Sequence, residues 1–133
     1  MLTKLLAVDP GHVHCGVAFF VGGVLEYAEE MSPEELYKKL KVVKADVVVV
    51  ESWRLYPWVN QGFDTMETPQ VIGVVKYLCK ERGIKVVMQD ALIKKATFAR
   101  YKEELAKVRG GHAKDAACHG MYYLNHGYLE HGD

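Results

Sequence analysis

Leu5-Leu6-Ala7-Val8-Asp9-Pro10-Gly11, residues 5–11, is a short apolar run followed by a carboxylate and two turn-forming residues. The apolar run predicts a buried β-strand, and Pro10-Gly11 predicts the turn that stops it. Asp9 is therefore expected at the carboxyl end of a buried strand. Later in the chain, Val47-Val48-Val49-Val50 is too apolar to alternate, which is typical of a strand covered on both faces, and it ends in the same way at Glu51.

Further strands and helices are expected around these two strands. Residues 16–21 and 24–27 predict an antiparallel hairpin, because Gly22-Gly23 between them is a turn signal. Ser32-Pro33-Glu34-Glu35 predicts a helix start, with a serine cap, a proline in the first position and a glutamate that completes a capping box. The other expected elements are a helix that starts near Asp64 or Thr68 and ends at Gly83, a strand at 84–88, a helix at 98–108 and a last helix at 112–125.

The order of these elements predicts one α/β domain that spans residues 1–133. Three strands of hairpin type come first, and alternating strands and helices follow. The expected sheet is therefore a mixed five-stranded one, with three antiparallel strands and then parallel strands, flanked by helices. No run approaches the roughly 18 apolar residues of a membrane helix, the N-terminus lacks a signal-peptide pattern, and the cysteines are widely spaced. We expect a cytoplasmic protein with no membrane partner.

Charge is balanced over the whole chain but unevenly distributed along it. The 17 basic and 17 acidic residues give a net charge of +0, which is unusual for a protein that grips a polyanion. Residues 94–114 nevertheless form a basic segment in which only Glu103 and Glu104 are acidic. Its low acid content favours a surface that faces phosphates over an ordinary solvated face. The basic residues of the segment are Lys94, Lys95, Arg100, Lys102, Lys107, Arg109 and Lys114.

The two carboxylates at strand ends indicate a metal site. If their strands are neighbours in a parallel sheet, Asp9 and Glu51 lie side by side at the edge where α/β proteins bind ligands. Two such carboxylates raise each other's pKa unless a cation lies between them. Oxygen ligands favour hard cations such as Mg²⁺ or Mn²⁺, and two of these ions can activate a water and stabilise the leaving oxygen of a phosphodiester.

The start of the last expected helix supplies further candidate ligands. His112 and Asp115 are three residues apart, so they share one face within the first turn. Ala116, Ala117 and Gly120 are small and let the helix approach the sheet closely. Such an approach would bring Asp115 near the two strand ends.

Several of these residues also have a plainer interpretation. Alone, Asp9 could cap its turn, Glu51 could be a surface residue and Asp115 could be an ordinary helix-start charge. His119, one turn beyond Asp115, is either a partner that orients a ligand or a packed histidine. The loop after Glu51 either stacks on unpaired bases or packs against protein, and its aromatic residues are Trp53, Tyr56, Trp58 and Phe63.

Four blocks follow one another along the chain: Val8-Asp9-Pro10-Gly11, Gly16-Val17-Ala18, Val50-Glu51 and His112-Ala113-Lys114-Asp115-Ala116-Ala117. Together they resemble the RuvC family of Holliday junction resolvases, within the ribonuclease H superfamily. Residues 27–89 are most similar to the compact RuvC-like resolvases of bacteriophages. The resemblance implies a ribonuclease H-like fold and a homodimeric endonuclease. It also implies cleavage of four-way DNA junctions with Mg²⁺ or Mn²⁺, two ions to an active site.

The resemblance also implies roles for individual residues. Asp9, Glu51 and Asp115 match catalytic metal ligands, and His112 matches a position that serves as a ligand or a base. Lys94 and Lys95 resemble basic residues that meet the DNA backbone. The loop after Glu51 matches the segment that enters the junction. The expected nucleic-acid-binding residues are therefore Trp53, Arg54, Tyr56, Lys94 and Lys95, with Arg100 and Lys114 from the basic segment.

Three alternatives remain open at the level of sequence. The same fold could act on flaps, other branched DNA or RNA–DNA hybrids. It could also bind junctions without cutting them, although the intact carboxylates argue against this. Asp9-Pro10-Gly11 also resembles the phosphate motif of actin-like ATPases, but 133 residues are too few for that two-lobed fold.

Overall fold

The computed structural model describes residues 2–53 and 66–130, with side chains described as far as residue 126. Its centre is a five-stranded sheet with the order β3-β2-β1-β4-β5. Three strands pair antiparallel and the remaining pairings are parallel, so the expected mixed sheet is confirmed. The strands are β1 (Lys4–Asp9), β2 (Cys15–Val21), β3 (Val24–Met31), β4 (Val47–Glu51) and β5 (Lys85–Gln89).

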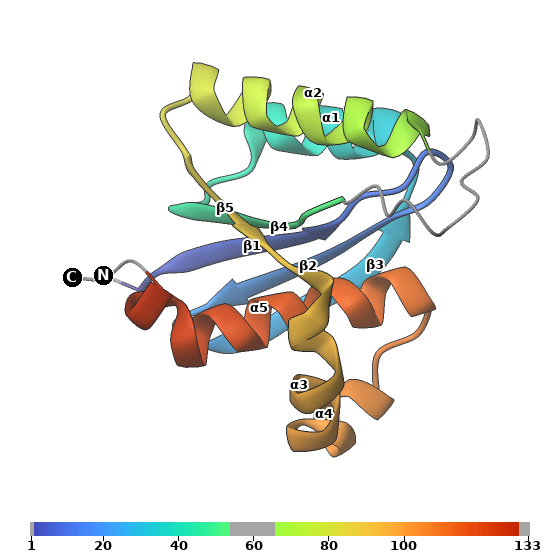
Figure 1. The fold of residues 1–133 in the computed structure, drawn as a ribbon. Helices are drawn as coiled ribbons and strands as arrows, with labels where there is room; N and C mark the ends of the chain where they lie inside the picture. Colours follow the sequence, from blue (N-terminus) through green and yellow to red (C-terminus); the bar gives the residue numbers. More distant parts are fainter. Residues whose placement is uncertain (1, 54–65, 131–133) are drawn as a thin grey trace.

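Helices cover both faces of this sheet, as Figure 1 shows. On one face lie α1 (Pro33–Val42) and α2 (Thr68–Glu81), and on the other face α5 (Gly111–Glu130) runs lengthwise along β1 and β2. The chain between β5 and α5 lies on the α5 side and forms a 3-10 turn, η2 (Ala91–Ile93), and two short helices, α3 (Lys94–Arg100) and α4 (Lys102–Ala106). No helix within the described ranges combines the length and apolar character needed to cross a membrane.

The central strands β1 and β4 are buried on both faces, as their unbroken apolar runs predicted. Leu5, Ala7 and Val49 point toward α5 and join one core cluster. Val8 and Val50 point the other way and pack beneath α1 and α2 in a second cluster. Close packing on both faces of the sheet holds β1 and β4 rigidly. The backbone positions of Asp9 and Glu51, at the ends of these strands, are therefore fixed.

The two helices on the α1 face begin differently. Ser32 caps α1: its hydroxyl accepts from the N–H of Glu35, and the Glu35 carboxylate accepts from the N–H of Ser32, which confirms the predicted capping box. For α2, the structure places Thr68 at the first helical position and Glu67 at the cap, without a side-chain cap hydrogen bond. The helix thus starts at Thr68, one of the two predicted positions, and Asp64 lies outside the described residues.

The predicted helix over residues 98–108 is wrong in its start and in its continuity. The helical segment begins at Lys94, after η2 is capped by the Asp90 carboxylate, and it breaks at Tyr101, whose φ of −112° and ψ of 33° leave the helical range. The break turns the chain so that Leu105 of α4 enters the core. A tertiary contact thus overrides the helical propensity of the segment.

The third strand is longer than expected. It continues beyond Tyr27 to Met31 and pairs with β2 along its whole length, with a register shift between Phe19 and Phe20. The continuation includes Glu29 and Glu30, which are exposed because β3 lies at the edge of the sheet. Charged residues are common on edge strands because they discourage pairing with other chains. Glu29 and Glu30 therefore broke the apolar pattern, and the prediction from sequence ended the strand too early.

Candidate active site

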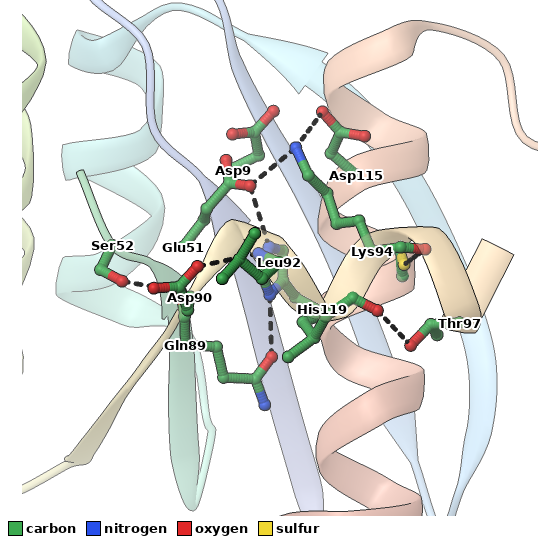
Figure 2. Close-up of polar contacts among 12 residues, drawn as sticks. Asp9, Glu51, Ser52, Gln89, Asp90, Leu92, Lys94, Thr97, Asp115 and His119 are labelled. Atoms are coloured by element: carbon green, nitrogen blue, oxygen red, sulfur yellow. Dashed lines mark hydrogen bonds and ion pairs between the residues drawn. The ribbon is translucent and has the colours of Figure 1, made fainter. Parts of the chain in front are cut away.

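The carboxylates of Asp9 and Glu51 come from neighbouring parallel strands. Val8 of β1 is the register partner of Val50 of β4, so the next residues, Asp9 and Glu51, end the two strands at the same edge of the sheet. The Asp9 side chain is 6% exposed and that of Glu51 is 14% exposed. Figure 2 shows the two carboxylates together above the ends of these strands. The sheet therefore holds two acids close together in a position with little solvent.

Small residues bring the start of α5 onto this edge. Gly16 of β2 is the register partner of Asp9, and a Cβ at Gly16 would overlap the backbone carbonyl of His112. Further along α5, a Cβ at Gly120 would overlap the ring of Phe20. These glycines, together with the fully buried Ala113, Ala116 and Ala117, let α5 lie directly on the sheet. The first turn of α5 is thereby placed beside Asp9.

His112 and Asp115 reach the site from this first turn. His112 Nδ1 lies 2.9 Å from Asp9 Oδ2, and its side chain is 45% exposed, so the ring lies between the buried acid and solvent. The backbone N–H of His112 donates to Glu30 Oε2 at 2.8 Å. A carboxylate from edge strand β3 thus satisfies a free N–H at the start of α5, and its negative charge suits the positive end of the helix.

Lys94 joins Glu51 to Asp115. Its Nζ lies 2.8 Å from Glu51 Oε1 and 3.4 Å from Asp115 Oδ2 (Figure 2). The side chain is 26% exposed, and it enters the site from the first residue of α3. The structure therefore places this lysine among the carboxylates, where an ammonium group supplies part of the positive charge that the acids require.

The acids retain more negative charge than Lys94 offsets. Burial raises the pKa of Asp9, a hydrogen bond with Glu51 and repulsion by Glu51 and Asp115 raise it further, and the pKa reaches about 9 despite the attraction of Lys94. Burial also acts to raise the pKa of Glu51, but hydrogen bonds with His119, Asp9 and Lys94 outweigh it and lower the pKa to about 2. At neutral pH one proton is therefore held on the Asp9 side of this pair.

The donor set fits a divalent cation once Lys94 moves away. Among the described residues, no three His, Cys, Asp or Glu side chains already stand in a metal-binding arrangement. Lys94 bridges Glu51 and Asp115, and the raised pKa of Asp9 keeps its carboxyl group neutral, so the charge of the acids is partly offset without a metal. The candidate ligands Asp9, Glu51 and Asp115 are oxygen donors of the kind that Mg²⁺ and Mn²⁺ prefer.

Behind Glu51 lies a buried polar pair. His119 of α5 is fully buried, and its Nε2 lies 3.1 Å from Glu51 Oε1 while its Nδ1 lies 2.8 Å from Gln89 Oε1. Sequence reasoning left open whether His119 orients a ligand or only packs, and it missed Gln89 altogether. The missed signal is that Gln89 ends β5, the strand next to β4, with Glu51 as its register partner.

The residues expected to contact nucleic acid differ in their exposure to solvent. Lys95 and Arg100 of α3 are exposed, while Lys114 of α5 is half-buried. Trp53 is also half-buried and packs against the core beneath α2, which supports the packing interpretation for this member of the aromatic loop. Arg54 and Tyr56 lie outside the described residues, as do Trp58 and Phe63.

Solved structures of known resolvases share this fold. RuvC from Thermus thermophilus aligns with a TM-score of 0.71 at 18% identity, over 96% of this chain and 97% of that chain. T. thermophilus RuvC in complex with a Holliday junction substrate aligns with a TM-score of 0.70 at 15% identity, over 96% of each chain. The fowlpox virus resolvase in complex with Holliday junction DNA gives 0.63 at 16% identity, over 91% of this chain and 98% of that chain.

Comparison by sequence yields no further relative: no family model and no curated protein matches the chain. The structural likeness establishes the ribonuclease H-like fold of the RuvC resolvases, which the sequence resemblance had implied.

Proposed function

We propose that this chain is a metal-dependent endonuclease that resolves four-way DNA junctions. The observation that carries the proposal is the pairing of Asp9 and Glu51 at the ends of adjacent parallel strands, with Asp115 linked to Glu51 through Lys94. The first turn of α5 places His112 beside Asp9 at this edge of the RuvC-like sheet. Asp9 and Glu51 are both largely buried and adjacent, and two such acids are costly to ionise together unless a cation binds between them, which favours a metal site over an incidental cluster.

In this proposal Asp9, Glu51 and Asp115 hold Mg²⁺ or Mn²⁺, with His112 as a further ligand or a base. A bound pair of such ions supplies an activated water and stabilises the leaving oxygen of the phosphodiester. For metal binding, Asp9 would release its proton to solvent, and the Lys94 ammonium would move away from the carboxylates. Lys94 could then turn toward a phosphate of the scissile strand. The same lysine would thus pair with the acids in the absence of metal and bind DNA in its presence.

The proposed substrate is branched DNA, and the proposed assembly is a homodimer in the cytoplasm. Lys95 and Arg100 lie exposed on α3, the helix whose first residue contacts Glu51, so α3 is suited to bind DNA phosphates near the site through Lys95 and farther from it through Arg100. Two opposed strands of a four-way junction need two cuts, and two copies of one active site related by symmetry can supply them.

Cleavage of a synthetic four-way junction tests the proposal. With Mg²⁺ or Mn²⁺, the wild-type protein should cut two opposed strands, and Asp9→Asn, which preserves the shape of the side chain, should not. Equal behaviour of the two proteins would refute the assigned site. A parallel panel of flaps, other branched DNA and RNA–DNA hybrids identifies the preferred substrate, and tight binding of junctions without any product would instead indicate a binding module.

A further inference from the structure

We propose that His119, held from behind by Gln89, is a positioning residue that fixes the Glu51 carboxylate for metal binding. This inference rests on the proposed function, because it gives a purpose to a buried polar pair on which a metal site would depend. His119 makes no described contact with Asp9 or Asp115, so it acts on the site through Glu51.

The His119 ring is held at both nitrogens. Nε2 lies 3.1 Å from Glu51 Oε1 and Nδ1 lies 2.8 Å from Gln89 Oε1, and no part of the side chain is exposed. Figure 2 shows the ring between the two partners, with Glu51 on one side and Gln89 on the other. With Nε2–H donating to the Glu51 carboxylate, Nδ1 is an acceptor, and the Gln89 amide serves it through its N–H once the amide O and N are exchanged. A ring paired at both nitrogens in a closed space has one orientation, and it fixes the orientation of the carboxylate that it contacts.

Gln89 is itself anchored to the strand that carries Glu51. Its backbone carbonyl accepts from the N–H of Ser52 at 2.7 Å and from the Ser52 hydroxyl at 2.9 Å. Gln89 is 3% exposed, and its Nε2 has no hydrogen-bond partner in the described part of the chain. A buried amide with an unused donor is costly in a core, so the contact of Gln89 with His119 is the feature that explains a glutamine at this position.

The contact with His119 does not depend on Lys94. Both side chains meet Glu51 Oε1, but Lys94 comes from α3 at the rim of the site and His119 comes from within α5. When a cation displaces Lys94, His119 still holds the carboxylate in place. Glu51 then meets the metal in a prepared orientation, and less conformational entropy is lost on binding.

Binding of Mn²⁺ to the full chain, measured by titration calorimetry without DNA, tests the inference. His119→Leu fills much of the space but removes the donor, and its Mn²⁺ affinity should fall by roughly 10–100-fold, as for outer partners of metal ligands. His119→Gln retains an N–H near the position of Nε2 and should stay close to wild type. Gln89→Leu frees the ring without touching Glu51, and it should weaken Mn²⁺ binding by a smaller factor.

A matched control separates positioning from packing. Met121→Ala removes a buried side chain from the same helix without contact to Glu51, so it should lower the melting temperature and leave Mn²⁺ affinity unchanged. If His119→Leu and Gln89→Leu are destabilised like Met121→Ala but bind Mn²⁺ like wild type, His119 only packs and the inference is wrong.

The same titration distinguishes failure of this inference from failure of the proposed function. If wild type binds Mn²⁺, His119→Leu binds it weakly and no nucleic acid is cut, the nuclease proposal fails and the positioning role stands. If wild type cuts junctions and His119→Leu retains full Mn²⁺ affinity, the positioning role fails alone. A wild-type protein without Mn²⁺ binding overturns both.

Discussion

Asp9 is the acid of the site whose pKa is raised most strongly by its surroundings. Its strand places the carboxyl group in a buried position on the α5 side of the sheet, beside His112, and the neighbouring acids repel its charge. The group keeps its proton to about pH 9, so the cation-free protein avoids a buried charge by retaining a hydrogen ion. A divalent cation at this position removes the reason for protonation, and proton release and metal binding should be linked.

Asp9→Asn should remove a pH dependence from the stability of the cation-free protein. Because the pKa of Asp9 is raised from 3.8 to about 9 in the folded state, folding takes up a proton between these values, and the free energy of unfolding falls as pH rises through this range. Asparagine takes up no proton, so the wild-type protein should lose more stability than the variant between pH 5 and pH 8.5. Urea unfolding of both proteins in EDTA measures the difference.

The pKa of Glu51 provides an internal contrast for this experiment. It is lowered to about 2, so the stabilisation contributed by Glu51 is complete above its ordinary pKa of 4.5 and is lost only as pH falls toward 2. The slope between pH 5 and pH 8.5 therefore belongs to Asp9 and not to Glu51. Equal slopes for wild type and Asp9→Asn would contradict the assigned protonation of Asp9.

Lys94→Gln should make the thermal stability of the protein depend more strongly on divalent cations. The lysine ammonium offsets part of the negative charge of Glu51 and Asp115 in the absence of metal, and glutamine cannot do so. We expect a lower melting temperature in EDTA and a larger rise on addition of Mn²⁺, because the cation no longer competes with a resident charge. Lys95→Gln, at an exposed neighbouring position, is the matched control and should respond as wild type does.

At the scale of elements, the approach of α5 to β2 determines whether the site exists. Gly16→Ala places a methyl group against the backbone carbonyl of His112, which cannot move without shifting the first turn of α5. We expect a loss of about 1–3 kcal/mol in the free energy of unfolding, and weaker Mn²⁺ binding, because His112 and Asp115 move away from Asp9. Urea unfolding and calorimetry provide the two measurements.

Gly73→Ala is the control for this substitution. Gly73 lies within α2, where an added Cβ meets open space, so alanine should stabilise the helix by up to about 1 kcal/mol. Its Mn²⁺ affinity should equal that of wild type. If Gly16→Ala were tolerated as well as Gly73→Ala, close packing of α5 would not be what holds the site together.

Glu30→Ala should destabilise the first turn of α5, because Glu30 of β3 accepts a hydrogen bond from that turn. The Glu30 carboxylate accepts the N–H of His112, and loss of a cap of this kind costs about 0.5–2 kcal/mol, with the lower part of that range expected for an exposed carboxylate. Glu29→Ala changes the preceding residue of β3, also exposed, and should have little effect on urea unfolding. Similar losses in the two variants would argue against the cap.

These elements also show what sequence reasoning can and cannot reach. Asp9 and Glu51 were predictable because unbroken apolar runs identify central strands, and a strand's last residue is readable from the turn signals after it. The Glu30 cap and the Gln89 contact were not predictable, since they join residues separated by 82 and 30 positions. The break at Tyr101 was missed because it serves the burial of Leu105, a tertiary requirement.

At the scale of the whole molecule, the proposed binding of DNA by a chain with a net charge of +0 would depend on local charge. The acids gather where cations are proposed to bind, while Lys95 and Arg100 stand exposed on α3, whose first residue, Lys94, contacts Glu51. Junction binding should therefore depend on few phosphate contacts. The affinity should fall with salt less steeply than for a strongly basic protein.

Salt-dependent binding of a four-way junction by the Asp9→Asn protein tests this distribution of charge. Addition of Lys95→Gln and Arg100→Gln should weaken binding and reduce the slope of log affinity against log salt by about one for each lost phosphate contact. Lys41→Gln is the control, because Lys41 is exposed near the end of α1 that leads to the start of β4, at the opposite edge of the sheet from Asp9. An unchanged slope in the double variant, or an equal change for Lys41→Gln, would place the DNA-binding surface elsewhere than on α3.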